Sequence, residues 1–164
     1  MVSPRDSGLS AEERFAIQDL LTEFGLRVDH GRAATVSELF VEDGVLATPM
    51  HTLEGRRQIE AHFARRDAPG TVVSRHQWSN LKLTVLGDDR VRAEMIVHTH
   101  LGTRGAGGGE GGPIRPDHVM VGDSLDVVER QSDGSWRFVE RRLQVAFKVE
   151  ADRHVAPGSQ PARG

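Results

Sequence analysis

The apolar residues of this 164-residue chain change their spacing near residue 71. Before that point they recur at helical spacing, most clearly over 11–29, where one stripe contains Ile17, Leu20, Leu21, Phe24 and Val28. After it they alternate with polar residues in long segments, which predicts strands at about 71–86, 90–101, 118–130 and 135–149. Helices followed by a run of antiparallel strands are typical of an α+β fold with its helices on one face of the sheet.

Local signals define the shorter elements. Ser10 and Glu13 form the spacing of a capping box, so the first helix should begin directly after Ser10. The segments that follow predict a helix at about 34–41, a turn at 42–44, a short strand at 45–48 and a helix at about 55–66.

The length and the distribution of glycine and proline predict one domain, over 11–150. Residues 1–10 should form a flexible arm and residues 151–164 a disordered tail. The segment 103–116 is rich in glycine, and we expect it to be a mobile loop at the mouth of a cavity.

Composition excludes several classes of function. With 21 Lys and Arg against 24 Asp and Glu, the net charge of −3 argues against nucleic-acid binding. The chain has no cysteine and no tyrosine, which excludes thiolate chemistry and a phenolic general acid. Neither a signal peptide nor an apolar run long enough for a membrane span is visible, so we expect a cytoplasmic protein with no membrane partner.

His76 is a candidate acid or base on the first long strand. An imidazole titrates near neutral pH and is a suitable proton carrier, although a histidine here could also simply be satisfied in the core or at its rim. Alternation places Trp78 and Asn80 on the same face as His76. Leu81, Leu83 and Val85 alternate on the opposite face from His76, so a bulge near 79–81 is needed if both sets of residues face inward.

Two carboxylates are further candidates. Asp29 ends the first helix, where the helix dipole should raise its pKa, or it could be a solvated surface group. Asp123 shares a strand face with aliphatic side chains, so we expect it to be buried. It would then be either an ion-pair partner of Arg141 or Arg142, or a pocket acid with a raised pKa.

His98 and His100 lie two apart on one strand, which is a possible spacing for metal ligands. The residues at 102–109 supply no further ligand, so we expect no metal site. Strict alternation places both histidines on the face opposite Met95, at a subunit interface or in solvent. A glycine pattern over 107–112 matches the dinucleotide fingerprint, but prolines follow it instead of a helix, and we expect no cofactor.

Four segments together resemble a known family: AIQDLL…VDHGRAATVSELFVEDG at 16–44, LEG at 53–55, RHQWSN at 75–80 and DGSWRF at 133–138. Their order and spacing are similar to those of the nuclear transport factor 2-like superfamily, and among its branches to the SnoaL-like proteins. The resemblance implies a cone-shaped α+β barrel, in which three N-terminal helices pack on a curved, mostly antiparallel sheet around a cavity.

The resemblance also implies an activity. It suggests a cofactor-independent dehydratase, isomerase or cyclase that acts on a hydrophobic, oxygenated molecule, polyketide-like or steroid-like, through an Asp29–His76 pair, with Asp123 as a further catalytic candidate. The residues expected to contact substrate are Phe24, Trp78, Asn80, Met95, His98 and His100. The alternative is a non-catalytic small-molecule-binding or assembly module of the same fold. Members of the superfamily commonly form homodimers, and we expect one through the outer face of the sheet, at Ile96, His98, Val128 and Met120.

Overall fold

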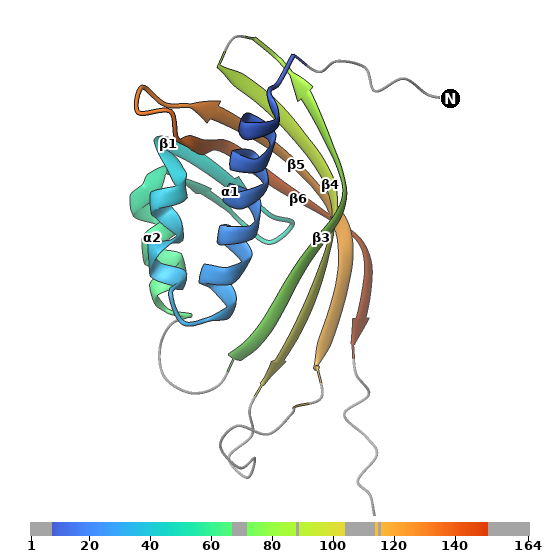
Figure 1. The fold of residues 1–164 in the computed structure, drawn as a ribbon. Coiled ribbons are helices and arrows are strands. Elements are labelled where there is room, and N and C mark those ends of the chain that lie inside the picture. The colour runs from blue at the N-terminus through green and yellow to red at the C-terminus, as the bar shows by residue number, and fades with distance from the viewer. Residues whose placement is uncertain (1–7, 67–71, 88, 104–113, 115, 151–164) are drawn as a thin grey trace, which may run out of the picture.

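Three helices cover one face of a curved sheet in the computed structural model, which describes residues 8–66, 72–87, 89–103, 114 and 116–150 (Figure 1). The helices are α1 (Ala11–Asp29), the 3-10 helix η1 (Ala33–Leu39) and α2 (Gly55–Ala64). The strands are β1 (Phe40–Ala47), β2 (Thr52–Glu54), β3 (Val72–Val85), β4 (Arg90–Thr103), β5 (His118–Arg130) and β6 (Trp136–Glu150). The α+β architecture expected from the sequence is therefore confirmed.

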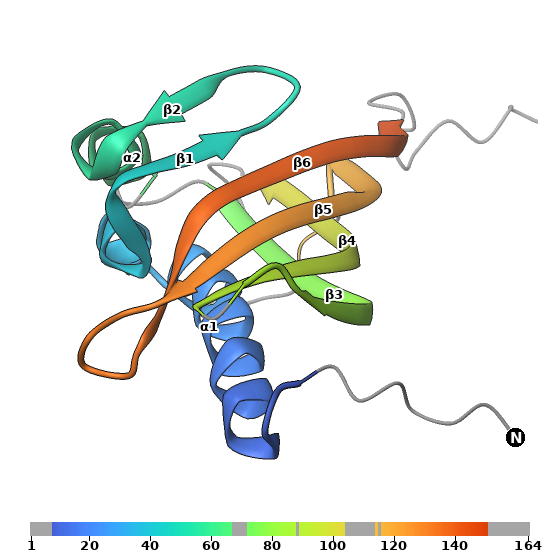
Figure 2. The ribbon, with the colours of Figure 1, turned by 90° about the horizontal axis from the view of Figure 1, so that it is seen from above.

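The sheet has the strand order β2-β1-β6-β5-β4-β3. Neighbouring strands are antiparallel except for β1 and β6, which are parallel. Seen from above, the sheet curls around the helices without closing on itself (Figure 2). Strand β3 is one edge of the sheet, and it lies against α1.

Helix α1 begins as its capping box predicts. The Ser10 hydroxyl accepts a hydrogen bond from the Glu13 amide at 3.1 Å, and the Glu13 carboxylate accepts one from the Ser10 amide at 2.8 Å. The apolar stripe of α1 faces the sheet, where the ring of Phe24 contacts Phe40 and Phe138. These contacts hold α1 in place along the sheet, and with it the end of α1 that meets β3.

A bulge in β3 places the residues before it and the aliphatic residues after it on the same face of the sheet. Trp78 pairs with Val97 and Ser79 with Ile96, but the next pair is Lys82 with Glu94, which leaves one extra residue in β3. Asn80 lies in this bulge with a φ of 56°. The bulge expected at 79–81 is confirmed, and it allows the aliphatic end of β3 and His76 to face the helices together.

The segment 42–44, expected to be a turn, lies inside β1. The pairing of β1 with β6 shifts between Phe40 and Val45, so the turn-like residues form an irregularity within the strand. Gly44 is needed there, because a Cβ would lie 3.0 Å from the Phe138 carbonyl oxygen and from Phe40 Cβ. The short strand β2 was not expected, since three residues carry too little pattern to be recognised.

The two faces of β5 are reversed relative to the expectation from the sequence. Asp126 and Val128 are fully buried and face the helices, whereas Asp123 is exposed on the outer face. Val128 therefore belongs to the core and not to an outer surface, and Met120 shares its face. Alternation identifies two faces of a strand but not which of them the helices cover, and the aliphatic face was wrongly assigned to the interior.

Several expectations concern residues that the structure does not describe. The arm up to residue 7, most of the loop at 103–116 and the tail at 151–164 lie outside the described residues. Within the described part of the chain, no helix is long and apolar enough to cross a membrane.

Gly122 provides a test of the packing between β5 and β6. A Cβ at this position would lie 2.1 Å from the Gln144 carbonyl oxygen, at a register shift between the two strands. We expect Gly122→Ala to lower the free energy of unfolding by about 1–3 kcal/mol in urea denaturation, because the backbone must move to accept the methyl group. The control is Gly87→Ala, where a Cβ meets nothing within 4 Å. Equal stability of both variants would contradict the close approach of the two strands.

Candidate active site

A pocket of about 320 Å³ lies between α1 and the inner face of the sheet. Its volume is near the lower end of the range for small-molecule sites, roughly 300–1,000 Å³. Strand β3 approaches α1 closely here, since a Cβ on Gly25 would lie 3.4 Å from His76 Cβ. The lining includes Leu21, Phe24, Asp29, His76, Trp78, Val97 and Arg141.

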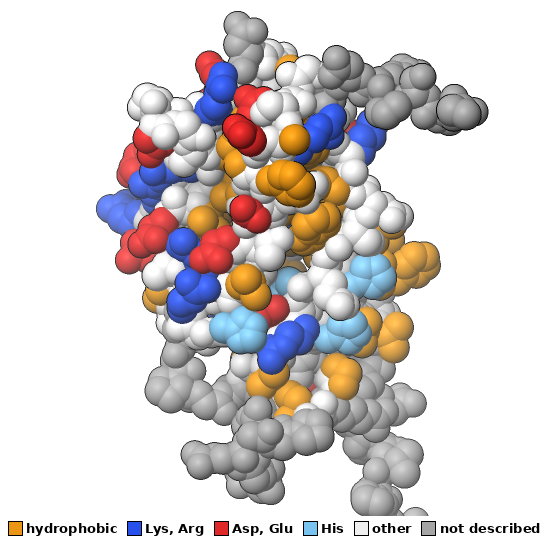
Figure 3. Space-filling model, in the orientation of Figure 1, with side chains coloured by type: hydrophobic (Ala, Val, Ile, Leu, Met, Phe, Trp, Pro, Cys, Tyr) orange, Lys and Arg blue, Asp and Glu red, His pale blue; other side chains and the backbone are white. Residues whose placement is uncertain are grey.

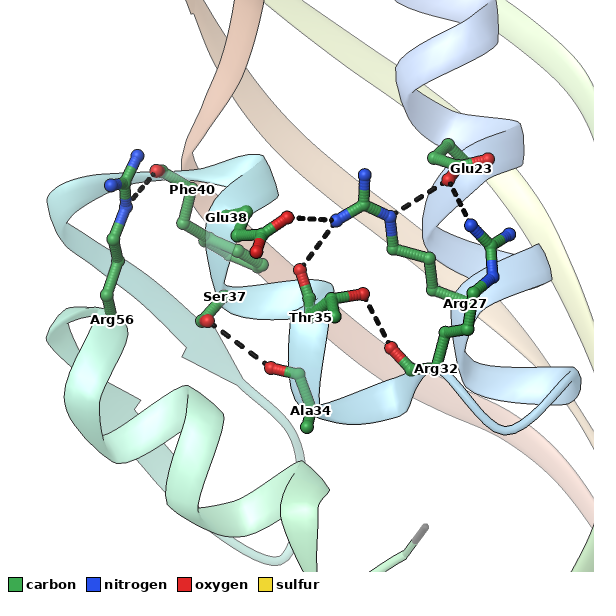
Figure 4. Close-up of polar contacts among 9 residues, drawn as sticks. All are labelled: Glu23, Arg27, Arg32, Ala34, Thr35, Ser37, Glu38, Phe40 and Arg56. Atoms are coloured by element: carbon green, nitrogen blue, oxygen red, sulfur yellow. Dashed lines mark hydrogen bonds and ion pairs between the residues drawn. The ribbon is translucent and has the colours of Figure 1, made fainter.

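The end of α1 that carries Asp29 is anchored to η1 by a polar network. Arg27 Nε donates to Glu23, and Arg27 Nη1 donates to the Thr35 carbonyl and to Glu38, at 2.7–2.9 Å (Figure 4). Arg32 also contacts Glu23 at 3.2 Å. These partly exposed pairs add modest stability, but they restrict the position of the last turn of α1.

The Asp29 carboxylate accepts three hydrogen bonds from β3. The Ser74 hydroxyl donates at 2.6 Å and the His76 backbone N–H at 2.7 Å, while Nδ1 of the His76 ring lies 2.6 Å from Oδ1. The side chain of Asp29 is only 5% exposed, and that of His76 is 20% exposed. The resemblance implied that these two residues form a pair, and the structure brings them into direct contact at the pocket.

Asp29 is ionised at neutral pH. Burial alone would raise its pKa, but the hydrogen bond and the charge of His76, with the Ser74 hydroxyl and the His76 amide, lower that pKa to about 2. The raised pKa expected from the helix dipole is therefore wrong, because these donors outweigh the dipole. An ionised Asp29 can only accept, so the proton of a neutral His76 ring sits on Nδ1 and Nε2 keeps its lone pair.

A second buried charge pair borders the pocket. Arg141 Nη1 lies 3.1 Å from Asp126 Oδ2, and the Ser124 hydroxyl donates to Asp126 Oδ1 at 2.7 Å. Burial raises the pKa of Asp126 to about 6 against the opposing effects of Arg141 and Ser124. The guanidinium carbon of Arg141 lies 4.2 Å from the centre of the Phe24 ring, which also lines the pocket.

The other residues expected to contact substrate are divided between the two sides of the sheet. Phe24 and Trp78 line the pocket as expected. Met95 is buried in the hydrophobic core and does not line it. His98 and His100 alternate with the inward-facing Val97, so they lie on the outer face, and the expectation that they contact substrate in this pocket is wrong.

Asn80 and Asp123 also lie outside the pocket. Both line an open hollow that includes Lys82 and Glu94. The expectation that Asp123 is buried is wrong, and the acid that pairs with Arg141 is Asp126. Sequence reasoning missed Asp126 because it assigned the opposite face of β5 to the interior. The available signal was that Asp126 and Arg141, which have opposite charges, lie directly opposite each other when β5 and β6 are paired as a hairpin.

Among the described residues, no group of three or more His, Asp or Glu side chains is arranged to bind a metal ion. The chemistry that this arrangement offers is proton transfer. It combines an oriented imidazole, an ionised carboxylate behind it and a guanidinium in the same small pocket.

Comparison with known proteins shows the same fold in several solved structures. A candidate scytalone dehydratase from Novosphingobium aromaticivorans is 20% identical with a TM-score of 0.73, over 96% of this chain and 99% of that chain. A hexachlorocyclohexane dehydrochlorinase, LinA type 2, is 19% identical with a TM-score of 0.70, over 90% and 96%. ActVI-ORFA from Streptomyces coelicolor is 16% identical with a TM-score of 0.67, over 81% and 96%. No curated protein matches the sequence significantly.

These identities are low, so the solved structures establish the nuclear transport factor 2-like fold and no more. The family assignment comes from the sequence itself, which matches the SnoaL-like domain over residues 10–142. That match covers most of the chain, and the protein therefore belongs to the SnoaL-like domain family.

Proposed function

We propose that the protein is a cofactor-independent enzyme that removes and returns a proton on a small, apolar, oxygenated molecule. The observation that carries this proposal is the 2.6 Å contact between Asp29 Oδ1 and His76 Nδ1 on the wall of the pocket. An imidazole held through Nδ1 by an ionised carboxylate acts as a general base through Nε2, and the carboxylate stabilises the imidazolium that forms.

The pocket lining supports an apolar substrate. Phe24, Trp78 and Val97 provide ring and aliphatic surface, and the volume of about 320 Å³ suits a small ring system. Dehydration, isomerisation and cyclisation all begin with the same proton removal. Among them we favour an elimination, because two of the similar structures carry the names of a dehydratase and a dehydrochlorinase.

A non-catalytic binding module of the same fold is the alternative. A structural role for the cavity would be favoured if aromatic side chains filled it, whereas Phe24 and Trp78 leave it open. A binding module also has no need to bury an ionised carboxylate against an imidazole, an arrangement that carries a desolvation cost. These observations favour the enzyme.

The pair can be tested by substitution. With a panel of small cyclic β-hydroxy ketones, the ultraviolet absorbance of the conjugated product follows turnover. We expect His76→Ala to lower kcat by about 10²–10⁴, the usual contribution of a general base. Asp29→Asn should also lower kcat, and the double variant should be little worse than the worse single one, because the two residues act as a unit.

The matched control is His100→Ala, which removes an imidazole from the outer face of the same sheet and should retain activity. The proposal fails if no member of the panel is converted, or if both single variants keep full activity. Loss of turnover on adding EDTA would also contradict it.

We further propose that two copies of the chain associate through the outer face of the sheet. Phe147 is 68% exposed and pairs with Val121 across β5 and β6, next to the exposed Val149. Apolar side chains protrude on the side of the molecule formed by the sheet (Figure 3). Exposed apolar side chains such as Phe147 and Val149 favour an association surface here. Ile96 and His98 lie on the same outer face of the sheet, whereas Val128 does not.

Light scattering tests this association. We expect the wild type to show twice the 18.0 kDa mass of the chain at micromolar concentration. Phe147→Asp should give the monomer, because a charge on the apolar face cannot be desolvated cheaply. Phe15→Asp is the control, since Phe15 on α1 is 65% exposed and lies away from that face. A monomeric wild type would refute the dimer.

A further inference from the structure

We propose that the indole N–H of Trp78 and the hydroxyl of Thr22 form a polar subsite in the pocket, which binds a neutral oxygen of the substrate at a distance from the reacting atoms. The two side chains are then specificity-determining residues. This inference rests on the proposed function. It adds one feature to the substrate, a second, uncharged oxygen on the side of the ring that faces away from His76.

The first observation is that the indole N–H of Trp78 has no acceptor. Trp78 is half-buried, packs against the hydrophobic core and lines the pocket. None of the described residues accepts a hydrogen bond from this N–H, and it is not one of the polar atoms that are sealed without a partner. The N–H of a buried tryptophan usually has a hydrogen-bond partner. Because this one is neither paired nor sealed, it is open to a ligand.

The second observation is the hydroxyl of Thr22. Thr22 is exposed on α1 and also lines the pocket, so it lies at the rim. A threonine within a helix often donates to the carbonyl four residues earlier, but the Thr22 hydroxyl has no hydrogen bond within the described part of the chain. A hydroxyl can both donate and accept, so this group suits a carbonyl, an ether or a hydroxyl oxygen.

The packing of α1 against β3 brings Thr22 and Trp78 to the same level of the pocket. The helix and the strand run in opposite directions (Figure 1), and a Cβ on Gly25 would lie 3.4 Å from His76 Cβ. Thr22 comes three residues before Gly25, which is about 4.5 Å along a helix. Trp78 comes two residues after His76, which is about 6.6 Å along a strand. The two residues therefore differ by only about 2 Å in height.

The spacing along β3 determines where the second oxygen lies on the substrate. His76 and Trp78 point to the same face of the strand, because they are two residues apart. The acid–base group and the free indole N–H are thus separated by about 6.6 Å along the strand, roughly the span of one six-membered ring and its substituents. A single ring that reaches both groups carries its second oxygen opposite the atom that exchanges a proton with His76.

The charges around the pocket favour a neutral oxygen over an anionic group. Asp29 is ionised, and the guanidinium of Arg141 is held by Asp126 at 3.1 Å, with its Nε and Nη1 atoms sealed. No other arginine or lysine of the described residues lines the pocket. A carboxylate or phosphate at the subsite would therefore be partly desolvated near Asp29 without a cation to compensate it, whereas an uncharged oxygen needs only the two neutral donors.

The indole N–H signals of the protein test the subsite independently of turnover. The chain has two tryptophans, so a proton–nitrogen correlation spectrum contains one indole signal from Trp78 and one from Trp136, which is buried outside the pocket. The probes are benzyl alcohol and toluene, which share a ring and differ by one hydroxyl group. We expect benzyl alcohol to move the Trp78 signal downfield, as a hydrogen bond to oxygen does. Toluene should bind without this shift, and the Trp136 signal should not move with either probe.

Substitutions measure what each group contributes to binding. Trp78→Phe keeps an aromatic wall but removes the N–H, and Thr22→Val keeps the shape of the side chain but removes the hydroxyl. Each should weaken the binding of benzyl alcohol about fivefold, the usual net contribution of one hydrogen bond, and leave the affinity for toluene nearly unchanged. Trp136→Phe is the matched control, and it should leave the preference for benzyl alcohol over toluene as in the wild type.

Failure of this subsite and failure of the proposed function give different results. His76→Gln should keep the downfield shift of the Trp78 signal, because the subsite does not use the imidazole, whereas loss of the acid–base pair shows only in turnover. The inference is overturned if benzyl alcohol does not bind, or if it binds without moving the Trp78 signal. It is also overturned if Trp78→Phe retains the wild-type preference for benzyl alcohol over toluene.

Discussion

The carboxylate of Asp29 joins the end of α1 to the edge of the sheet, and the pocket depends on this junction. Strand β3 is an edge strand, so some of its backbone N–H groups have no strand partner. Asp29 accepts the hydrogen bond of one of them, at His76, together with those of the Ser74 hydroxyl and the His76 ring. The Asp29 side chain thereby holds the end of α1 against β3, accepts a hydrogen bond from one backbone N–H of this edge strand and orients the imidazole of His76. The same bonds keep Asp29 charged in a buried position.

The distribution of polarity in the sheet fits the proposed chemistry. The face toward the helices carries the buried Asp126–Arg141 pair beside the pocket, whereas the opposite face of the sheet exposes Phe147 and Val149 of β6 beside Val121 and Val119 of β5. Charges that are largely buried, as those of Asp29 and Arg141 are, act more strongly than charges in water, which suits proton transfer. An apolar outer face has no such use in a monomer, and it is the feature behind the proposed association of two copies.

Most of the fold could be predicted from the sequence, because the capping box of α1 and the alternation of the long strands are strong local signals. Even the bulge in β3 could be predicted, since the polar and apolar residues of that strand were out of step. The side of β5 that faces the helices could not, because period-two alternation is symmetric and the aliphatic face looked like the core. The Asp29–His76 pair was expected from the resemblance to the SnoaL-like proteins, whereas the role of Asp126 as the partner of Arg141 was missed because the two faces of β5 were exchanged.

The tautomer of His76 is the most direct test of the central claim, that an ionised Asp29 leaves Nε2 as a free base in the pocket. Proton–nitrogen correlation NMR with ¹⁵N-labelled histidine reads this directly, at a pH where the ring is neutral. We expect a proton on Nδ1 and an unprotonated Nε2 in the wild type. In Asp29→Asn the amide can donate to Nδ1, and the proton should move to Nε2. A wild-type ring protonated on Nε2 would contradict the account.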